Sequence, residues 1–104
     1  MIIVTTESIP GRQIVEAKGF VQGSTVRAKH LGRDIAAGLK NLVGGELSGY
    51  TELLNESRQE AISRMIQQAL QVGANAIVSA RFSTSAITQA ASEVFCYGTA
   101  VVIQ

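Results

Sequence analysis

The sequence is poor in charged residues, aromatic residues, proline and cysteine. Charged side chains make up 16% of the 104 residues and aromatic ones 5%, with one proline, one cysteine and no tryptophan. A single cysteine excludes the disulfide framework that stabilises small secreted proteins, so we expect a cytoplasmic protein. Nine Lys and Arg residues against eight Asp and Glu residues give a net charge of +1. This balance argues against a nucleic-acid partner.

Long uninterrupted apolar runs are also missing, although 46% of the residues are hydrophobic. No stretch approaches the roughly 18 apolar residues of a membrane span, and the N-terminal residues do not resemble a signal peptide. A mean hydropathy of +0.22 excludes disorder. We therefore expect one folded domain over residues 1–104, without a membrane partner. The excess of apolar over charged residues predicts that a further copy or another partner covers part of its surface.

Alternating apolar and polar residues predict a long strand over residues 14–29. Its apolar residues lie on one face as far as Val21 and on the other face from Val26. A strand changes phase only by inserting a residue, and glycine is common where this happens. We therefore expect a β-bulge near Gly23.

Three further strands are predicted, one near the N-terminus and two at the C-terminus. Residues 2–6 form a short apolar strand, and a tight turn with Pro10 and Gly11 at its centre follows. Residues 74–84 and 93–103 alternate with period two. The first of these has one apolar face, formed by Ala76, Val78, Ala80 and Phe82.

Two helices are predicted between these strands. Residues 30–43 carry a single apolar stripe and form a short helix, which Gly44 and Gly45 end. Residues 48–72 form a long helix, in which Glu60 and Arg64 are spaced for an ion pair. This helix has two adjacent apolar lines, formed by Ala61, Met65, Ala69 and Val72 and by Ile62, Ile66 and Leu70. Two lines make a stripe wider than one packing partner requires.

The last predicted strand is apolar on both of its faces. Small residues, among them Cys96 and Gly98, occupy the face against which a helix can pack closely. The other face is bulky and consists of Phe95, Tyr97, Val101 and Ile103. One helical layer covers only one face of a sheet, so we expect these four residues to contact another copy of the chain. The element order predicts a two-layer α+β fold, with a small antiparallel sheet packed against a short and a long helix.

Few residues are suited to metal binding or catalysis. A zinc site needs about four Cys, His or carboxylate ligands, and this chain has one His and one Cys. His30, Cys96 and Glu46 could hold a divalent heavy metal only if an oligomer brought copies of them together. Cys96 has the alternative role of a buried structural residue. No nucleophile elbow or phosphate-binding loop occurs, so we expect no enzymatic activity.

Polar side chains are concentrated around the junction of the two predicted helices and on one strand. The cluster consists of Arg33, Asp34, Glu46, Tyr50, Glu52 and Arg81. Guanidinium and carboxylate groups in these proportions either form ion pairs at an interface or line a polar pocket. We favour ion pairing, and a small-ligand or enzyme pocket between subunits remains the alternative.

Eight short strings of residues, taken together, resemble one family over residues 2–103. They are Thr5-Thr6, Ile9-Pro10-Gly11, Gly32-Arg33-Asp34-Ile35, Asn41-Leu42-Val43-Gly44-Gly45-Glu46, Tyr50-Thr51-Glu52-Leu53-Leu54, Gly73-Ala74-Asn75-Ala76-Ile77-Val78, Arg81-Phe82 and Tyr97-Gly98-Thr99-Ala100-Val101. With these strings the sequence resembles the YbjQ-like family of small bacterial and archaeal proteins, a family that is labelled as heavy-metal-binding.

The resemblance implies a fold related to the dodecin subunit and a ring-like homopentamer in which extra short strands help to join neighbouring subunits. It supplies no established catalytic or ligand residues. Our leading hypothesis is therefore a homo-oligomeric binding or structural module, in which the chain's main partner is itself. Heavy-metal binding at subunit interfaces is the second hypothesis.

Overall fold

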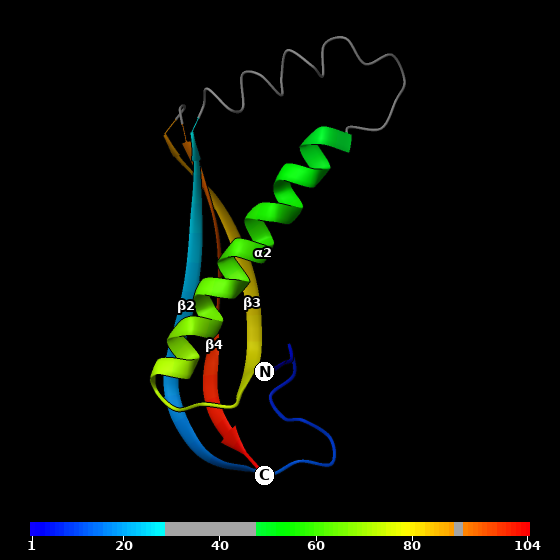
Figure 1. Cartoon of the computed structure of the whole chain (residues 1–104), viewed down its shortest axis with the longest axis vertical. Coiled ribbons are helices and arrows are strands. Elements are labelled where there is room, and N and C mark those ends of the chain that lie inside the picture. Colours follow the sequence, from blue (N-terminus) through cyan, green and yellow to red (C-terminus); the bar gives the residue numbers. More distant parts are fainter. Residues whose placement is uncertain (29–47, 89–90) are drawn as a thin grey trace.

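The computed structural model describes residues 1–28, 48–88 and 91–104 of the chain. In chain order the elements are β1 (Ile2–Ile3), β2 (Ile14–Ala28), α2 (Ser48–Gln71), β3 (Ala76–Thr88) and β4 (Ala91–Ile103). The strands form one sheet in the order β1-β3-β4-β2 (Figure 1). Because β1 runs parallel to β3, the sheet is mixed, which corrects the expectation of an antiparallel sheet. The predicted short helix over 30–43 lies outside the described residues.

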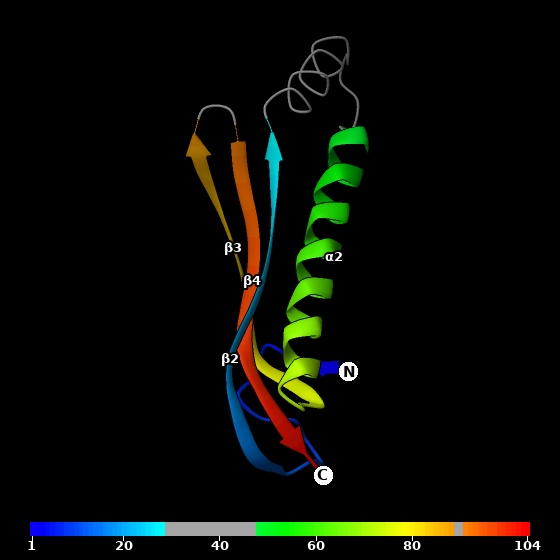
Figure 2. The ribbon, with the colours of Figure 1, turned by 60° about the vertical axis from the view of Figure 1, so that its left-hand side comes forward.

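Helix α2 lies along one face of the sheet, nearest to β2 (Figure 2). Ala61, Met65 and Ala69 of its first apolar line face the sheet, whereas Val72 of that line is 44% exposed. The core there consists of Val21, Ala61, Met65, Ala69, Ala74, Ile77, Ala80, Cys96 and Ala100. The helix ends where Gly73 takes a φ of 81°. The amides of Gly73 and Ala74 then bind the carbonyls of Leu70 and Ala69, the pattern of a glycine-terminated helix. The predicted long helix is thus confirmed.

Gly23 of β2 lets the helix approach the sheet closely. A Cβ atom at this position would lie 2.1 Å from the carbonyl oxygen of Ala61 and 2.5 Å from the amide nitrogen of Met65. Two residues further along β2, the buried hydroxyl of Thr25 donates a hydrogen bond of 3.2 Å to the carbonyl of Ser57. The absence of a side chain at Gly23 is therefore a requirement of packing against α2.

The β-bulge expected near Gly23 lies instead further toward the start of β2. The pairing register with β4 shifts between Ala17 and Gly19, and Gly19 has a φ of 113°. From Gly19 to Ala28 the pairing is regular, so Gly23 continues the helix-facing phase. A glycine relieves the positive φ at the true bulge.

Strand β3 also contains a bulge, which corrects the prediction of one continuous apolar face there. Ser79 has a φ of 55°, and the register with β4 shifts between Val78 and Arg81. Before the bulge, Ala76 and Val78 lie on the face away from α2; after it, Ala80 belongs to the core beneath the helix. The inserted residue reverses the face of the sheet on which the following side chains of β3 lie.

The N-terminal segment covers part of the sheet face opposite α2. The turn predicted around Pro10 and Gly11 is confirmed, since the amide of Arg12 binds the carbonyl of Ile9 and Gly11 has a φ of 77°. The second core cluster comprises Ile9, Ala76, Val78, Val101 and Ile103, with Val4 packed against it. Val101 and Ile103 are therefore covered by their own chain, contrary to the expectation of an uncovered face.

Candidate functional site

The sheet face opposite α2 also carries a row of aromatic side chains, of which Phe20 is exposed and Phe95 and Tyr97 are half-buried. Phe20 of β2 is 65% exposed, and its ring centroid lies 6.2 Å from that of Tyr97 on β4. The ring of Tyr97 stacks on that of Phe95 at 5.5 Å. Val26, 53% exposed, lies further along β2 on the same face. We call Phe20, Val26, Phe95 and Tyr97 the aromatic face; an uncovered surface of this kind is typical of an interaction site.

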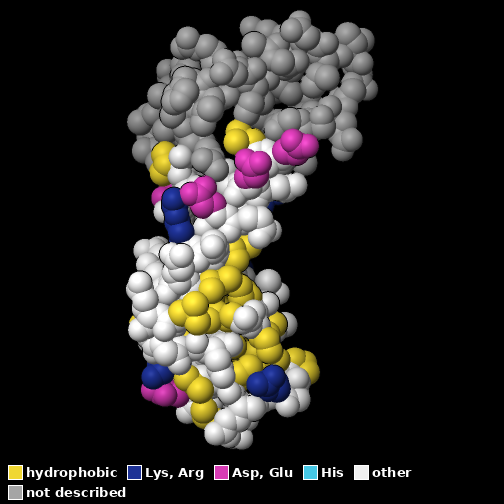
Figure 3. All heavy atoms as spheres, viewed as in Figure 1, with side chains coloured by type: hydrophobic (Ala, Val, Ile, Leu, Met, Phe, Trp, Pro, Cys, Tyr) yellow, Lys and Arg dark blue, Asp and Glu magenta, His cyan; other side chains and the backbone are white. Residues whose placement is uncertain are grey.

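A second apolar surface lies on α2, on the other layer of the molecule. Ile62 and Ile66 are half-buried, and Leu70 is 61% exposed. Figure 3 shows hydrophobic side chains gathered over the lower half of this view and most of the acidic ones above them. We call Ile62, Ile66 and Leu70 the helix stripe; it is the second apolar line predicted from the sequence.

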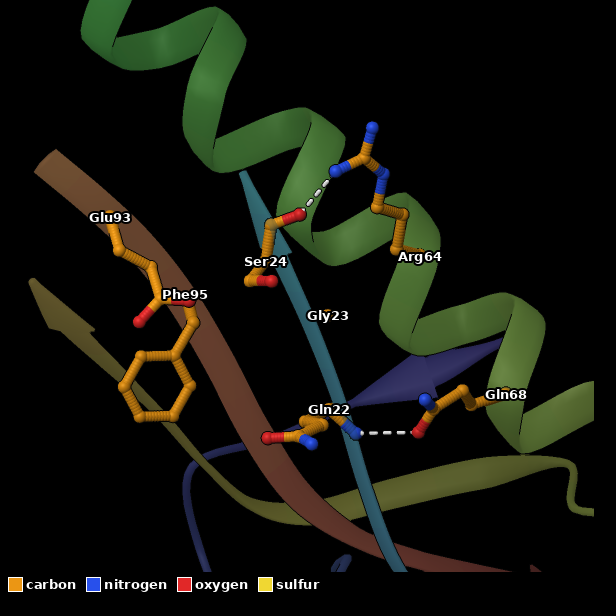
Figure 4. Close-up of a pocket in the computed structure, with 7 residues that line it drawn as sticks. All are labelled: Gln22, Gly23, Ser24, Arg64, Gln68, Glu93 and Phe95. Atoms are coloured by element: carbon orange, nitrogen blue, oxygen red, sulfur yellow. Dashed lines mark hydrogen bonds between the residues drawn. The ribbon is translucent and has the colours of Figure 1, made fainter. Parts of the chain in front are cut away.

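A polar pocket of about 380 Å³ lies at the outer edge of β2. It is lined by Gln22, Gly23, Ser24, Arg64, Gln68, Glu93 and Phe95 (Figure 4). The backbone amide of Gln22 donates a hydrogen bond of 2.9 Å to the Oε1 atom of Gln68, and the Arg64 guanidinium donates one to the backbone carbonyl of Ser24. Arg64 also forms the predicted ion pair with Glu60, at 2.6 Å.

The predicted polar cluster is described only in part. Arg33, Asp34 and Glu46 lie outside the described residues, and Tyr50 and Glu52 lie in the first turns of α2. Arg81 of β3 donates to the carbonyls of Thr5, at 2.7 Å, and Ala80, at 2.8 Å. Its guanidinium thus fastens the N-terminal segment to β3.

The metal candidates are likewise described only for Cys96, because His30 and Glu46 lie outside the described ranges. Cys96 is buried beneath α2, and burial raises the pKa of its thiol, which disfavours the thiolate that binds metals. Within residues 1–28, 48–88 and 91–104 no three His, Cys, Asp or Glu side chains come together to hold a metal ion. The described residues therefore do not fit a resident metal site.

Sequence reasoning did not identify Phe20 or the pocket at the β2 edge. Phe20 carries a recognisable signal, because a large aromatic residue stands directly before Val21 on the opposite phase of a half-buried strand. Gln68 carries no such signal, since it is one of several exposed polar residues of α2. Among the described residues, no helix is long and apolar enough to cross a membrane.

Comparison with solved structures supports the α+β fold. A crystal structure of a protein of unknown function from Pediococcus pentosaceus, assigned to the DUF74 family, superposes with a TM-score of 0.68. It is 18% identical in sequence, and the similarity covers 100% of this chain and 98% of that one. At this identity the similarity concerns the fold alone.

Comparison with known sequences identifies the family. A family model described as "Putative heavy-metal-binding" matches residues 1–104. A UPF0145 protein from Hahella chejuensis is 60% identical over 104 residues, covering 100% of both chains. Another, from Acinetobacter baylyi, is 66% identical over 96 residues, which cover 92% of this chain and 89% of the relative. The chain therefore belongs to the YbjQ family of UPF0145 proteins, as its resemblance had implied.

Proposed function

We propose that this chain is the subunit of a homo-oligomer that serves as a binding or structural module. The observation that carries the proposal is the aromatic face, whose Phe20 side chain is 65% exposed although its ring lies beside that of Tyr97. Burying exposed aromatic rings releases about 25 cal/mol per Å² of apolar surface, so a second copy has a strong driving force to cover them. The lone buried cysteine supports a reducing compartment such as the cytoplasm.

The two apolar surfaces support a head-to-tail arrangement of subunits. The aromatic face lies on the sheet layer, and the helix stripe lies on the helix layer. When one copy's aromatic face packs against the next copy's helix stripe, every subunit uses two different surfaces. Such a contact closes into a ring if its rotation permits. Five copies is the number that the family resemblance implies.

Replacing Phe20 tests the proposal. Phe20→Ser removes apolar area from the aromatic face, and its high exposure means that folding loses little. We expect the subunit to shift from oligomer toward monomer in sedimentation velocity, with unchanged circular dichroism. Val15→Ser is the matched control, because Val15 is an exposed apolar residue of the same strand, 45% accessible, outside the aromatic face. An assembly unaffected by Phe20→Ser would contradict this use of the face.

The family's description supports metal binding between subunits as a second proposal. In this proposal His30 and Glu46 supply the ligands, since burial holds Cys96 in its neutral thiol form. Elemental analysis after growth with zinc, copper and nickel tests it. We expect metal to be retained by wild type and by Cys96→Ala and to be lost from His30→Ala. Retention of no metal by wild type would refute the proposal.

A further inference from the structure

Strand β2 forms one edge of the sheet, with β4 as its neighbour on the inner side. Backbone groups on the free side of an edge strand can pair with a strand from another chain. The Gln22 amide binds a helix side chain, so it points away from β4 and into the pocket at this edge. Residues 20–26, Phe-Val-Gln-Gly-Ser-Thr-Val, carry no charge. Two copies could therefore pair here in antiparallel fashion without bringing like charges together.

Two side chains of α2 already occupy this edge. Gln68 accepts a hydrogen bond from the Gln22 amide, and Arg64 donates one to the Ser24 carbonyl (Figure 4). A neighbouring strand would present a carbonyl acceptor to the Gln22 backbone amide and an amide donor to the Ser24 carbonyl. Gln68 and Arg64 supply the same acceptor and donor. The ion pair with Glu60, at 2.6 Å, holds the guanidinium of Arg64 in place.

The spacing of the two side chains matches that of the backbone groups. Arg64 and Gln68 are four residues apart on a helix, a rise of about 6 Å. Gln22 and Ser24 are two residues apart on a strand, a rise of roughly 6.6 Å. The match lets two consecutive turns of α2 reach two consecutive outward-facing residues of β2.

We propose that Arg64 and Gln68 guard the β2 edge, by occupying the backbone groups through which a second copy of this chain would otherwise add as a neighbouring strand. The guard leaves Phe20 of the aromatic face and Leu70 of the helix stripe exposed. Open-ended strand pairing at the β2 edge, which leads to fibres, is thereby suppressed.

The double variant Arg64→Ala/Gln68→Ala tests the guard. We expect it to form species larger than those of wild type, growing with concentration and binding thioflavin T. The matched control is Arg58→Ala/Gln67→Ala, which removes the same two residue types from exposed positions of α2. A folded double variant with the size distribution of wild type would overturn the proposal.

Amide hydrogen exchange gives a second readout that does not require association. At low concentration, Gln68→Ala should speed exchange at the Gln22 amide on the order of tenfold, while the inward-facing Gly23 amide keeps its protection. Unchanged exchange at Gln22 would also overturn the proposal. The proposed homo-oligomer is tested separately, by the mass of wild type, so failure of one proposal leaves the other standing.

Discussion

At the scale of single residues, the positions that matter most are those where a side chain is small or missing. Gly23 brings α2 against β2, and Gly98 of β4 leaves room for Ile77, whose Cγ2 atom would lie 2.7 Å from an added Cβ. Cys96, between these glycines in the core, is a structural thiol. These three residues of the described part of the chain therefore act through packing.

Gly23→Ala should strongly destabilise the fold. The added methyl would overlap backbone atoms of Ala61 and Met65, which cannot move without displacing the helix. We expect the free energy of unfolding in urea to fall by about 3 kcal/mol. Gly11→Ala is the control, because its Cβ meets open space and only its positive φ is strained; this should cost about 1 kcal/mol. Equal stability of the two variants would contradict the close approach at Gly23.

Cys96 should make stability fall at alkaline pH. Because burial raises the pKa of its thiol, the folded chain keeps the proton at pH values where the unfolded chain loses it. The stability is fully present below the ordinary thiol pKa, about 8.5, and decreases as pH rises beyond it. Urea unfolding between pH 7 and 10 should show a steeper decline for wild type than for Cys96→Ala. Parallel declines would contradict a buried neutral thiol.

At the scale of elements, the sequence predicts the helix and strands well and the faces of the strands poorly. The long helix, its closing Gly73 and the turn at Pro10 follow from local patterns that tertiary contacts do not alter. The sequence pattern predicts the bulge near Gly23 because Val26 resembles a core residue there, whereas Val26 belongs to the aromatic face and is 53% exposed. Alternation identifies a buried face only where the chain itself covers its apolar residues.

The bulge in β3 leaves no signal in the sequence, for a related physical reason. Both faces of β3 carry apolar residues, since α2 covers one and the N-terminal segment covers part of the other. A phase change between two covered faces leaves no mark in the hydrophobic pattern of the sequence.

The candidate surfaces are predictable only in part. The helix stripe follows from the spacing of its apolar residues along the sequence. The positions of Arg64 and Gln68 at the β2 edge depend on the distance between α2 and that edge, which the sequence does not reveal.

Substitutions at Ser79 test this bulge. Its φ of 55° disfavours β-branched residues, while glycine adopts it freely. We expect Ser79→Val to lower the free energy of unfolding by about 2 kcal/mol and Ser79→Gly to leave it nearly unchanged. Ser83→Val, in the regular part of β3, should have little effect. If valine were tolerated equally at both positions, the bulge would not be at Ser79.

At the scale of the whole molecule, two layers leave two apolar surfaces on opposite sides. In a head-to-tail contact two different surfaces meet, whereas in a two-fold contact the same surface is used twice. Mixing two variants, each with one surface altered, distinguishes the two. Phe20→Ser spoils the aromatic face and Leu70→Ser spoils the helix stripe, so each should be largely monomeric alone. Mixed, the two variants retain one intact pair of surfaces and should form heterodimers that do not grow further. Absence of heterodimers in native mass spectrometry would contradict the head-to-tail contact.

The mass of the wild-type protein in solution tests the central claim most directly. Sedimentation equilibrium at micromolar concentration should give a multiple of the 11.0 kDa chain mass, five-fold in the ring that the family resemblance implies. The aromatic face and helix stripe predict that this assembly persists in high salt, since apolar contacts are not screened. A single species of 11.0 kDa across the concentration range would contradict the proposed homo-oligomer.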